Sequence, residues 1–162
     1  MATYHCSIKH GNGDKVLPHF DYINRQNKYD KKQGLIHTAS GNMPSCVLDA
    51  KEFWTKCAEK DKRAYREIEF ALPNELTREE QIQLVEEYIQ EVIPNNPYTY
   101  AIHEPESAIH GIKNPHVHLM FSERLLTEDV KDLDKETFFK KRGINRIGET
   151  YGGAIKDRSW AG

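Results

Sequence analysis

Two histidines separated by a single residue carry the clearest chemical signal in this sequence. His116-Val117-His118 lies in an apolar run typical of a strand. Side chains at positions i and i+2 of a strand share one face, so both imidazoles are expected to point the same way. His103 ends the preceding predicted strand and is expected to approach that face. Three imidazoles would form a metal site with open positions for a substrate. Taken alone, however, the histidine pair also suits an ordinary surface strand.

Two carboxylates occur with the same spacing on another predicted strand. Glu67 and Glu69 share one face, while Ile68 and Phe70 face the core. A carboxylate on the face of the histidines could orient a metal-bound imidazole or accept a proton. Exposed carboxylates that only aid solubility explain the same pattern, and the spacing does not decide between Glu67 and Glu69.

A tyrosine early in the chain is a third candidate for chemistry. Tyr22 lies in the segment Phe20-Asp21-Tyr22-Ile23 of a predicted helix. A phenol is a poor nucleophile near neutral pH because its ordinary pKa is about 10, so it needs a base or a cation beside it. On the residues alone, a packing role for Tyr22 is equally consistent.

Hydrophobic periodicity gives the elements that must position these residues, in the order β-α-α-β-α-β-β-α. The sequence predicts strands over 3–9, 65–72, 97–103 and 115–122, helices over 19–29, 49–64, 78–93 and 135–142, and irregular chain over 35–48. Pro18 is expected to be the first helical residue. We therefore predict an α+β fold, a two-layer sandwich whose mostly antiparallel sheet carries helices on one face and the active site on the open face.

Composition narrows the class of protein. The 162 residues suit a single domain. No apolar run is long enough to span a bilayer and no signal peptide is evident, which predicts a cytoplasmic protein without membrane insertion. The three cysteines lack metal-binding or disulfide spacing and are expected to be reduced. The net charge is −2 overall but +5 over residues 1–66, −10 over 67–130 and +3 over 131–162, so the ends of the chain are basic.

Several separate segments in order resemble one family of proteins. The sequence resembles the MobA/MobL, or MobQ-class, relaxases of mobilisable plasmids, a branch of the HUH endonucleases. The segments that carry the resemblance are Tyr4-His5, Asp21-Tyr22-Ile23, Lys28-Tyr29, Ser40-Gly41-Asn42-Met43-Pro44, Glu67-Ile68-Glu69-Phe70-Ala71-Leu72-Pro73, Glu75-Leu76-Thr77, Tyr98-Thr99-Tyr100-Ala101-Ile102-His103 and Asn114-Pro115-His116-Val117-His118-Leu119-Met120-Phe121-Ser122-Glu123-Arg124. The last of these contains the family's histidine-hydrophobic-histidine signature in its usual frame.

The resemblance implies a role for each candidate residue. Tyr22 maps to the nucleophile, with Tyr29 as the nearest competitor. The metal-binding histidines map to His103, His116 and His118, and the acidic pair of the central strand maps to Glu67 and Glu69. The basic residues that flank the tyrosine are expected to contact DNA phosphates; they are Arg25, Lys28, Lys31 and Lys32.

The implied activity is site-specific nicking and rejoining of one DNA strand at a plasmid origin of transfer, through a 5′-phosphotyrosyl intermediate. The expected cofactor is a divalent ion, Mn²⁺ or Mg²⁺, with Zn²⁺ as a further candidate. The expected partners are single-stranded origin DNA, accessory mobilisation proteins and a conjugative secretion apparatus. Residues 1–162 are expected to form one monomeric domain of a bacterial protein, as the N-terminal part of a longer chain. The alternatives are a rolling-circle replication initiator, a non-catalytic DNA-binding domain and a zinc hydrolase that activates water.

Overall fold

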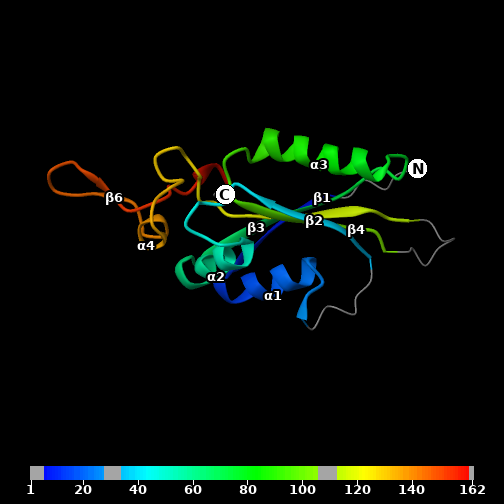
Figure 1. The fold of residues 1–162 in the computed structure, drawn as a ribbon, viewed down its shortest axis with the longest axis horizontal. Helices are drawn as coiled ribbons and strands as arrows, with labels where there is room; N and C mark the ends of the chain where they lie inside the picture. Colours follow the sequence, from blue (N-terminus) through cyan, green and yellow to red (C-terminus); the bar gives the residue numbers. More distant parts are fainter. Residues whose placement is uncertain (1–5, 28–33, 106–112, 161–162) are drawn as a thin grey trace.

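A five-stranded antiparallel sheet forms the centre of the molecule (Figure 1). The computed structural model describes residues 6–27, 34–105 and 113–160. The strands of the sheet follow the order β1-β3-β5-β4-β2. Its five members are β1 (Cys6–Asn12), β2 (Leu35–Gly41), β3 (Arg63–Ala71), β4 (Tyr98–His103) and β5 (His116–Phe121). The predicted fold class and the antiparallel sheet are thus confirmed.

Helices cover both faces of this sheet, which differs from the predicted single covered face (Figure 1). The helices are α1 (Gly13–Ile23), α2 (Ala50–Lys60), α3 (Arg78–Val92) and α4 (Lys135–Phe138). One buried cluster joins α1 and α2 to one face, and a second joins α3 to the other. The physical reason lies in β4, where every side chain is buried, so neither of its faces can be left to water.

The face toward α1 and α2 is the one that matters for the site. Ala101 and Met120 belong there to one buried cluster with Phe20 and Trp54, whereas Ile102 and Leu119 belong to the cluster of α3 on the other side. Positions of odd number in β4 and of even number in β5 therefore face α1. His103, His116 and His118 belong to that set, so the site lies beside α1 and not on a helix-free face.

Helix α1 begins earlier than predicted, and Pro18 lies inside it. Its buried residues Val16, Phe20 and Ile23 recur at helical spacing, and this stripe runs straight across the proline. A proline inside a helix removes one backbone hydrogen bond and crowds the carbonyl four residues earlier, and packing against α2 and the sheet outweighs these costs. The earlier start matters because it sets which residues of α1 point toward the sheet.

Strand β2 was predicted to be irregular, and that prediction was wrong. It is an edge strand that pairs with β4 alone, and its residues are partly exposed, so it needs no continuous apolar run. The predicted helix over 135–142 contracts to a single turn, α4, followed by a two-stranded ribbon of β6 (Gly143–Ile144) and β7 (Thr150–Tyr151) and a 3₁₀ turn, η2 (Arg158–Trp160).

Two predicted helices also end early, α1 at Ile23 and α2 at Lys60, and β3 begins at Arg63, inside the predicted helix over 49–64. Two further local predictions agree with the structure. Helix α3 starts at the predicted capping box of Thr77 and Glu80. All three cysteines are free, and Cys57 is buried. Among the described residues, every helix is too short or too polar to cross a bilayer.

Candidate metal and nucleophile site

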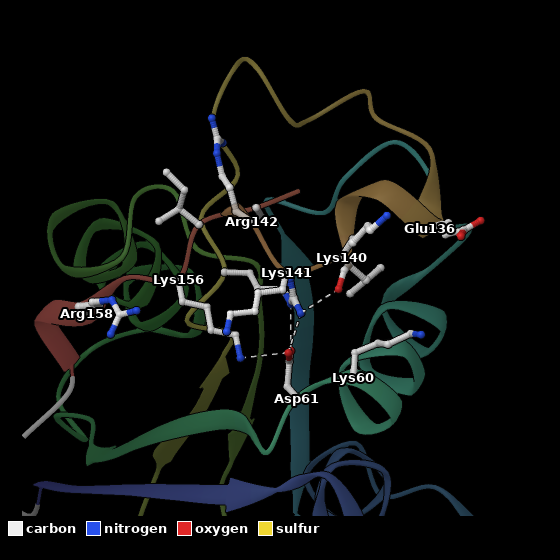
Figure 2. Close-up of a pocket in the computed structure, with 12 residues that line it drawn as sticks. Lys60, Asp61, Glu136, Lys140, Lys141, Arg142, Lys156 and Arg158 are labelled. Carbon is white, nitrogen blue, oxygen red and sulfur yellow. Dashed lines mark hydrogen bonds and ion pairs between the residues drawn. The ribbon is translucent and has the colours of Figure 1, made fainter. Parts of the chain in front are cut away.

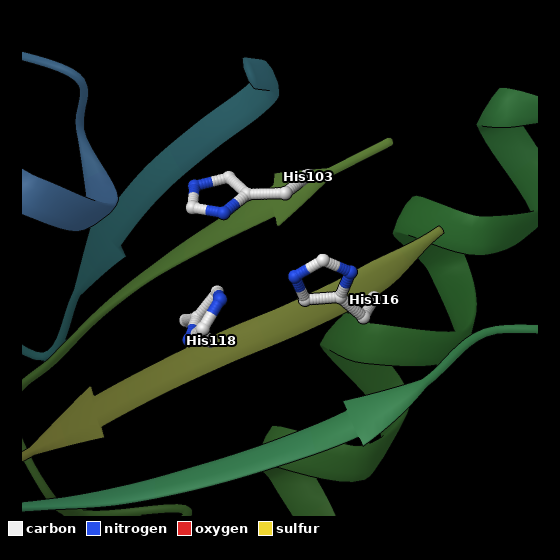
Figure 3. Close-up of side chains that lie close together, drawn as sticks. All are labelled: His103, His116 and His118. Carbon is white, nitrogen blue, oxygen red and sulfur yellow. The ribbon is translucent and has the colours of Figure 1, made fainter. Parts of the chain in front are cut away.

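Three histidines converge where β4 ends and β5 begins (Figure 3). His103 pairs directly with His116 across the two antiparallel strands, and His118 follows two residues on along the same face. One ring nitrogen from each of the three lies within 4.8 Å of the others. His103 and His118 are buried, and His116 is partly exposed. The predicted set of histidines is thus brought together at one point.

Glu67 fixes the orientation of His118. The Nδ1 atom of His118 donates a hydrogen bond to Glu67 Oε1 over 2.8 Å, which leaves Nε2 for a metal ion. Glu69 is a weaker partner, since its Oε2 lies 3.8 Å from the same Nδ1. Of the two predicted carboxylates, Glu67 is the one that contacts the cluster closely, and it is 4% exposed.

The other two histidines also use one ring nitrogen for an oxygen of the protein. His116 Nδ1 lies 3.2 Å from the carbonyl of Asn114, and His103 Nε2 lies 2.7 Å from the carbonyl of Ile23. The second nitrogen of His103, Nδ1, accepts from Arg25 Nη2 at 3.2 Å. Each imidazole is therefore oriented by a carbonyl or a carboxylate, which is the arrangement that supports metal-binding histidines. The donor set fits a divalent cation.

The protonation states suit metal binding. Burial lowers the pKa of His103 to about 3 and also lowers the pKa of His116. Both rings are then neutral near pH 7, and neutral imidazole is the form that binds metals. Burial alone would raise the pKa of Glu67, but the hydrogen bond from His118 and the nearby His19 outweigh it and lower that pKa to about 2. Glu67 is therefore an anion beside His118.

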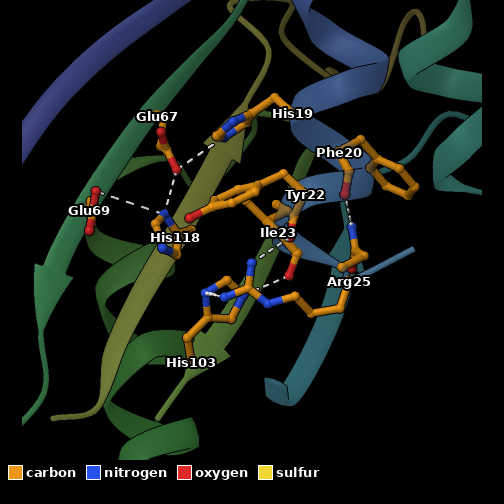
Figure 4. Close-up of polar contacts among 10 residues, drawn as sticks. His19, Phe20, Tyr22, Ile23, Arg25, Glu67, Glu69, His103 and His118 are labelled. Carbon is orange, nitrogen blue, oxygen red and sulfur yellow. Dashed lines mark hydrogen bonds and ion pairs between the residues drawn. The ribbon is translucent and has the colours of Figure 1, made fainter. Parts of the chain in front are cut away.

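Tyr22 projects from the last turn of α1 over the histidines (Figure 4). Its ring centre lies 6.2 Å from that of His118 and 6.4 Å from that of His103, edge-on to both. The guanidinium of Arg25 lies 4.8 Å from the centre of the Tyr22 ring, within range of a cation–π contact. A tyrosine predicted to act with the histidines thus lies beside them, together with a cation.

His19 is a member of the site that the sequence analysis missed. Its Nε2 lies 3.0 Å from Glu67 Oε1, so Glu67 stands between His19 and His118. The His19 ring also stacks on Tyr65, with 4.9 Å between ring centres. One signal could have revealed it: residues three apart on a helix face the same way, so a helix that presents Tyr22 also presents His19.

A pocket of about 430 Å³ opens beside these residues. Besides the predicted groups, its lining contains the cations Lys9 from β1 and Lys15 from α1. Of the four basic residues predicted to contact DNA, Arg25 lies at the site, against Tyr22 and His103. Lys28, Lys31 and Lys32 lie outside the described residues, as does the competing Tyr29.

The chain is similar to known proteins along most of its length. The model of the MobA/MobL family matches residues 12–161. The "43 kDa relaxation protein" of Salmonella typhimurium is 44% identical over 149 residues, which cover 87% of this chain and 39% of that protein. "Mobilization protein A" of Escherichia coli is 37% identical over 172 residues, covering 99% of this chain and 23% of that protein. The chain thus spans less than half the length of these relatives.

A solved structure described as "Molecular Basis of Vancomycin Resistance Transfer in Staphylococcus aureus" contains a chain of similar fold. The TM-score is 0.61 at 18% sequence identity, and the match covers 99% of this chain and 84% of that one. At this level of identity the likeness concerns the fold.

Proposed function

The chain belongs to the MobA/MobL family, and on this premise we propose that it nicks and rejoins one strand of DNA at an origin of transfer. The observation that carries the proposal is the position of Tyr22 over three converging histidines. A phenol, a candidate metal site and cations beside an open pocket are the groups that a phosphodiester transfer to tyrosine requires.

In this reaction the Tyr22 oxygen attacks the phosphorus of one phosphodiester, and the bond from phosphorus to the 3′ oxygen breaks. The products are a 5′-phosphotyrosyl bond and a 3′-hydroxyl. The phenolic proton leaves to water in the pocket, and the departing 3′ oxygen takes up a proton. Because the phosphodiester bond is exchanged and not hydrolysed, the 3′-hydroxyl can attack the phosphotyrosine and rejoin the strand.

His103, His116 and His118 would hold a divalent cation, Mn²⁺, Mg²⁺ or Zn²⁺, which when bound supplies stabilisation for the negative charge on the phosphate oxygens. Glu67 is a positioning residue that holds His118 with one nitrogen toward the ion. Lys9 and Lys15 line the same pocket and are suited to contact phosphates next to the scissile one.

We further propose that residues 1–162 act as the nicking domain of this system. Relatives named for relaxation, mobilisation and conjugal transfer support accessory mobilisation proteins and a transfer apparatus as partners. Nicking of DNA by the 162-residue chain itself is the part of these proposals that is tested directly.

The test is a search for the covalent adduct. The chain is incubated with Mn²⁺ and single-stranded oligonucleotides tiled over both strands of the replicon that encodes it, and the products are separated on a denaturing gel. We expect one oligonucleotide to give a protein–DNA adduct with the wild type and none with Tyr22→Phe. Tyr151→Phe is the matched control, because Tyr151 lies in β7 and is half exposed.

The other outcomes point to a different nucleophile or to a different activity. An adduct that persists in Tyr22→Phe but vanishes in Tyr29→Phe would move the nucleophile to Tyr29. A cut that depends on Mn²⁺ and leaves no adduct would replace the proposal with a hydrolase that activates water. Binding of the oligonucleotides without any cut would leave a DNA-binding domain.

A further inference from the structure

A second and larger pocket lies at the end of the sheet opposite the histidines. It has a volume of about 610 Å³. Its lining comes from the end of α2, from Arg124 three residues after β5, and from the segments around α4 and η2 (Figure 2). Seven cationic side chains line it against two carboxylates; the cations are Lys60, Arg124, Lys140, Lys141, Arg142, Lys156 and Arg158.

A buried ion pair builds the floor of this basic pocket. Arg124 donates to both carboxylate oxygens of Asp61 over 2.9 and 2.6 Å, and both residues are at most 5% exposed. The same guanidinium donates to the carbonyls of Phe138 and Phe139, which fixes α4 against the sheet. Lys156 adds a third contact to Asp61, at 3.1 Å. The pocket is therefore held together by its own residues without a ligand.

The rim of the basic pocket retains positive charge that these contacts do not use. Asp61 is the partner of Arg124 and Lys156, and Arg142 pairs with Asp129. Within the described part of the chain, ion pairs are absent for the exposed rim residues Lys60, Lys140, Lys141 and Arg158. Concentrated cations without partners favour an anionic ligand.

The chemistry of the lining favours phosphate groups over bases. Phe139, the one aromatic residue of the lining, is 3% exposed and already packed against Phe53 and the Arg124 guanidinium. It therefore offers no ring on which a base could stack, and stacking rings are what single-strand binders use to hold bases. Lysine and arginine side chains around a pocket instead suit the oxygens of a sugar–phosphate backbone.

Strand β5 connects the basic pocket to the proposed nicking site. Arg124 follows His118 by six positions, which at about 3.3 Å per residue is at most roughly 20 Å. DNA advances about 3.4 Å per nucleotide along a duplex strand, so the gap corresponds to at most about six nucleotides. We propose that the basic pocket is a second DNA site, which binds backbone phosphates within about six nucleotides of the scissile phosphate. This inference rests on the proposed function, because it assumes that DNA is the substrate.

The test measures DNA affinity as a function of salt, because each phosphate contact contributes a fixed slope. Fluorescence anisotropy is recorded with EDTA present for a 6-nucleotide oligothymidylate, an 18-nucleotide oligothymidylate and an 18-base-pair duplex of mixed sequence. The pocket variant is Lys140→Gln/Lys141→Gln. The matched control is Lys51→Gln/Lys131→Gln, which removes two cations that do not line the pocket. Lys140→Arg/Lys141→Arg retains the charge.

We expect the pocket variant to flatten the slope of log affinity against log salt on a long probe and to leave the 6-nucleotide probe unchanged. The loss of two phosphate contacts predicts that this slope changes by about 1.4 on the single strand or by about 1.8 on the duplex. The probe that shows the change identifies the form of DNA bound. The arginine variant is expected to keep the wild-type slope.

Two results would overturn the proposal: wild-type slopes for the pocket variant on both long probes, or an equal change in the Lys51→Gln/Lys131→Gln control. The adduct assay with Tyr22→Phe separates this failure from that of the proposed function. If the wild type forms the tyrosine adduct while the pocket variant keeps wild-type slopes, only the second DNA site is lost. If the slopes change but no oligonucleotide is cut, the pocket binds DNA, while the nicking activity and the distance from a scissile phosphate are both refuted.

Discussion

Replacing Glu67 with glutamine tests whether this carboxylate prepares the histidine site for metal. The Glu67 side chain accepts a 2.8 Å hydrogen bond from His118 Nδ1 and is almost fully buried. Glutamine keeps the shape and one acceptor oxygen but removes the negative charge. A hydrogen bond to a charged group contributes about 1.5–3 kcal/mol, more than a neutral one. The change therefore isolates the effect of charge on the orientation and basicity of His118.

The expected loss of metal affinity follows from this geometry. Removing an outer partner of a metal-binding histidine typically weakens binding by about 10- to 100-fold. That range corresponds to about 1.4–2.7 kcal/mol, the same size as the charge-assisted hydrogen bond. Isothermal titration of the chain with Mn²⁺ measures the dissociation constant, and the melting temperature of the metal-free variant checks that it is folded.

Glu69→Gln supplies the matched control. Glu69 lies on the same strand and the same face, but its Oε2 is 3.8 Å from His118 Nδ1 and its side chain is 22% exposed. A solvated carboxylate at that distance contributes little, so we expect less than about a threefold change in the dissociation constant. Equal losses for the two variants, or a larger loss for Glu69→Gln, would refute the assignment of Glu67 as the positioning residue.

Three further perturbations test other parts of the structure. Arg25→Gln removes a cation that contacts His103 Nδ1 at 3.2 Å, so Mn²⁺ should bind more tightly by titration while DNA binding by anisotropy weakens. Asp61→Asn leaves the buried charge of Arg124 without its anionic partner and should lower the free energy of unfolding by about 3–5 kcal/mol in urea denaturation. A loss below about 1 kcal/mol would contradict a stabilising role for the buried ion pair. Burial lowers the pKa of His103 from 6.5 to about 3, so below pH 6.5 the unfolded chain binds a proton that the folded chain does not. The EDTA-treated protein should therefore lose stability as the pH falls from 6.5 toward 3, and His103→Gln should reduce this dependence in thermal melts at a series of pH values.

The parts of the fold with strong local patterns were predictable from the sequence. Helix α3 begins at its capping box, and β5 alternates its two histidines with the apolar Val117 and Leu119. The exceptions have a common cause, namely contacts between distant parts of the chain. Strand β2 exists because β4 offers a free edge, and α1 runs through Pro18 because its apolar stripe packs on α2. Neither partner is visible in the local sequence.

The choice between Glu67 and Glu69 shows why the site could be predicted only in part. Both carboxylates face the histidines, and strand pairing sets Glu69 directly opposite His118, so a correct register alone would have favoured Glu69. The observed bond runs diagonally from His118 to Glu67. Helix α1 accounts for this difference, because His19 lies against Glu67 from the other side and helps to bury it, while Glu69 stays partly exposed. Alternation along β3 yields the two candidates, but the selection between them depends on a helix packed from 48 residues away in the chain.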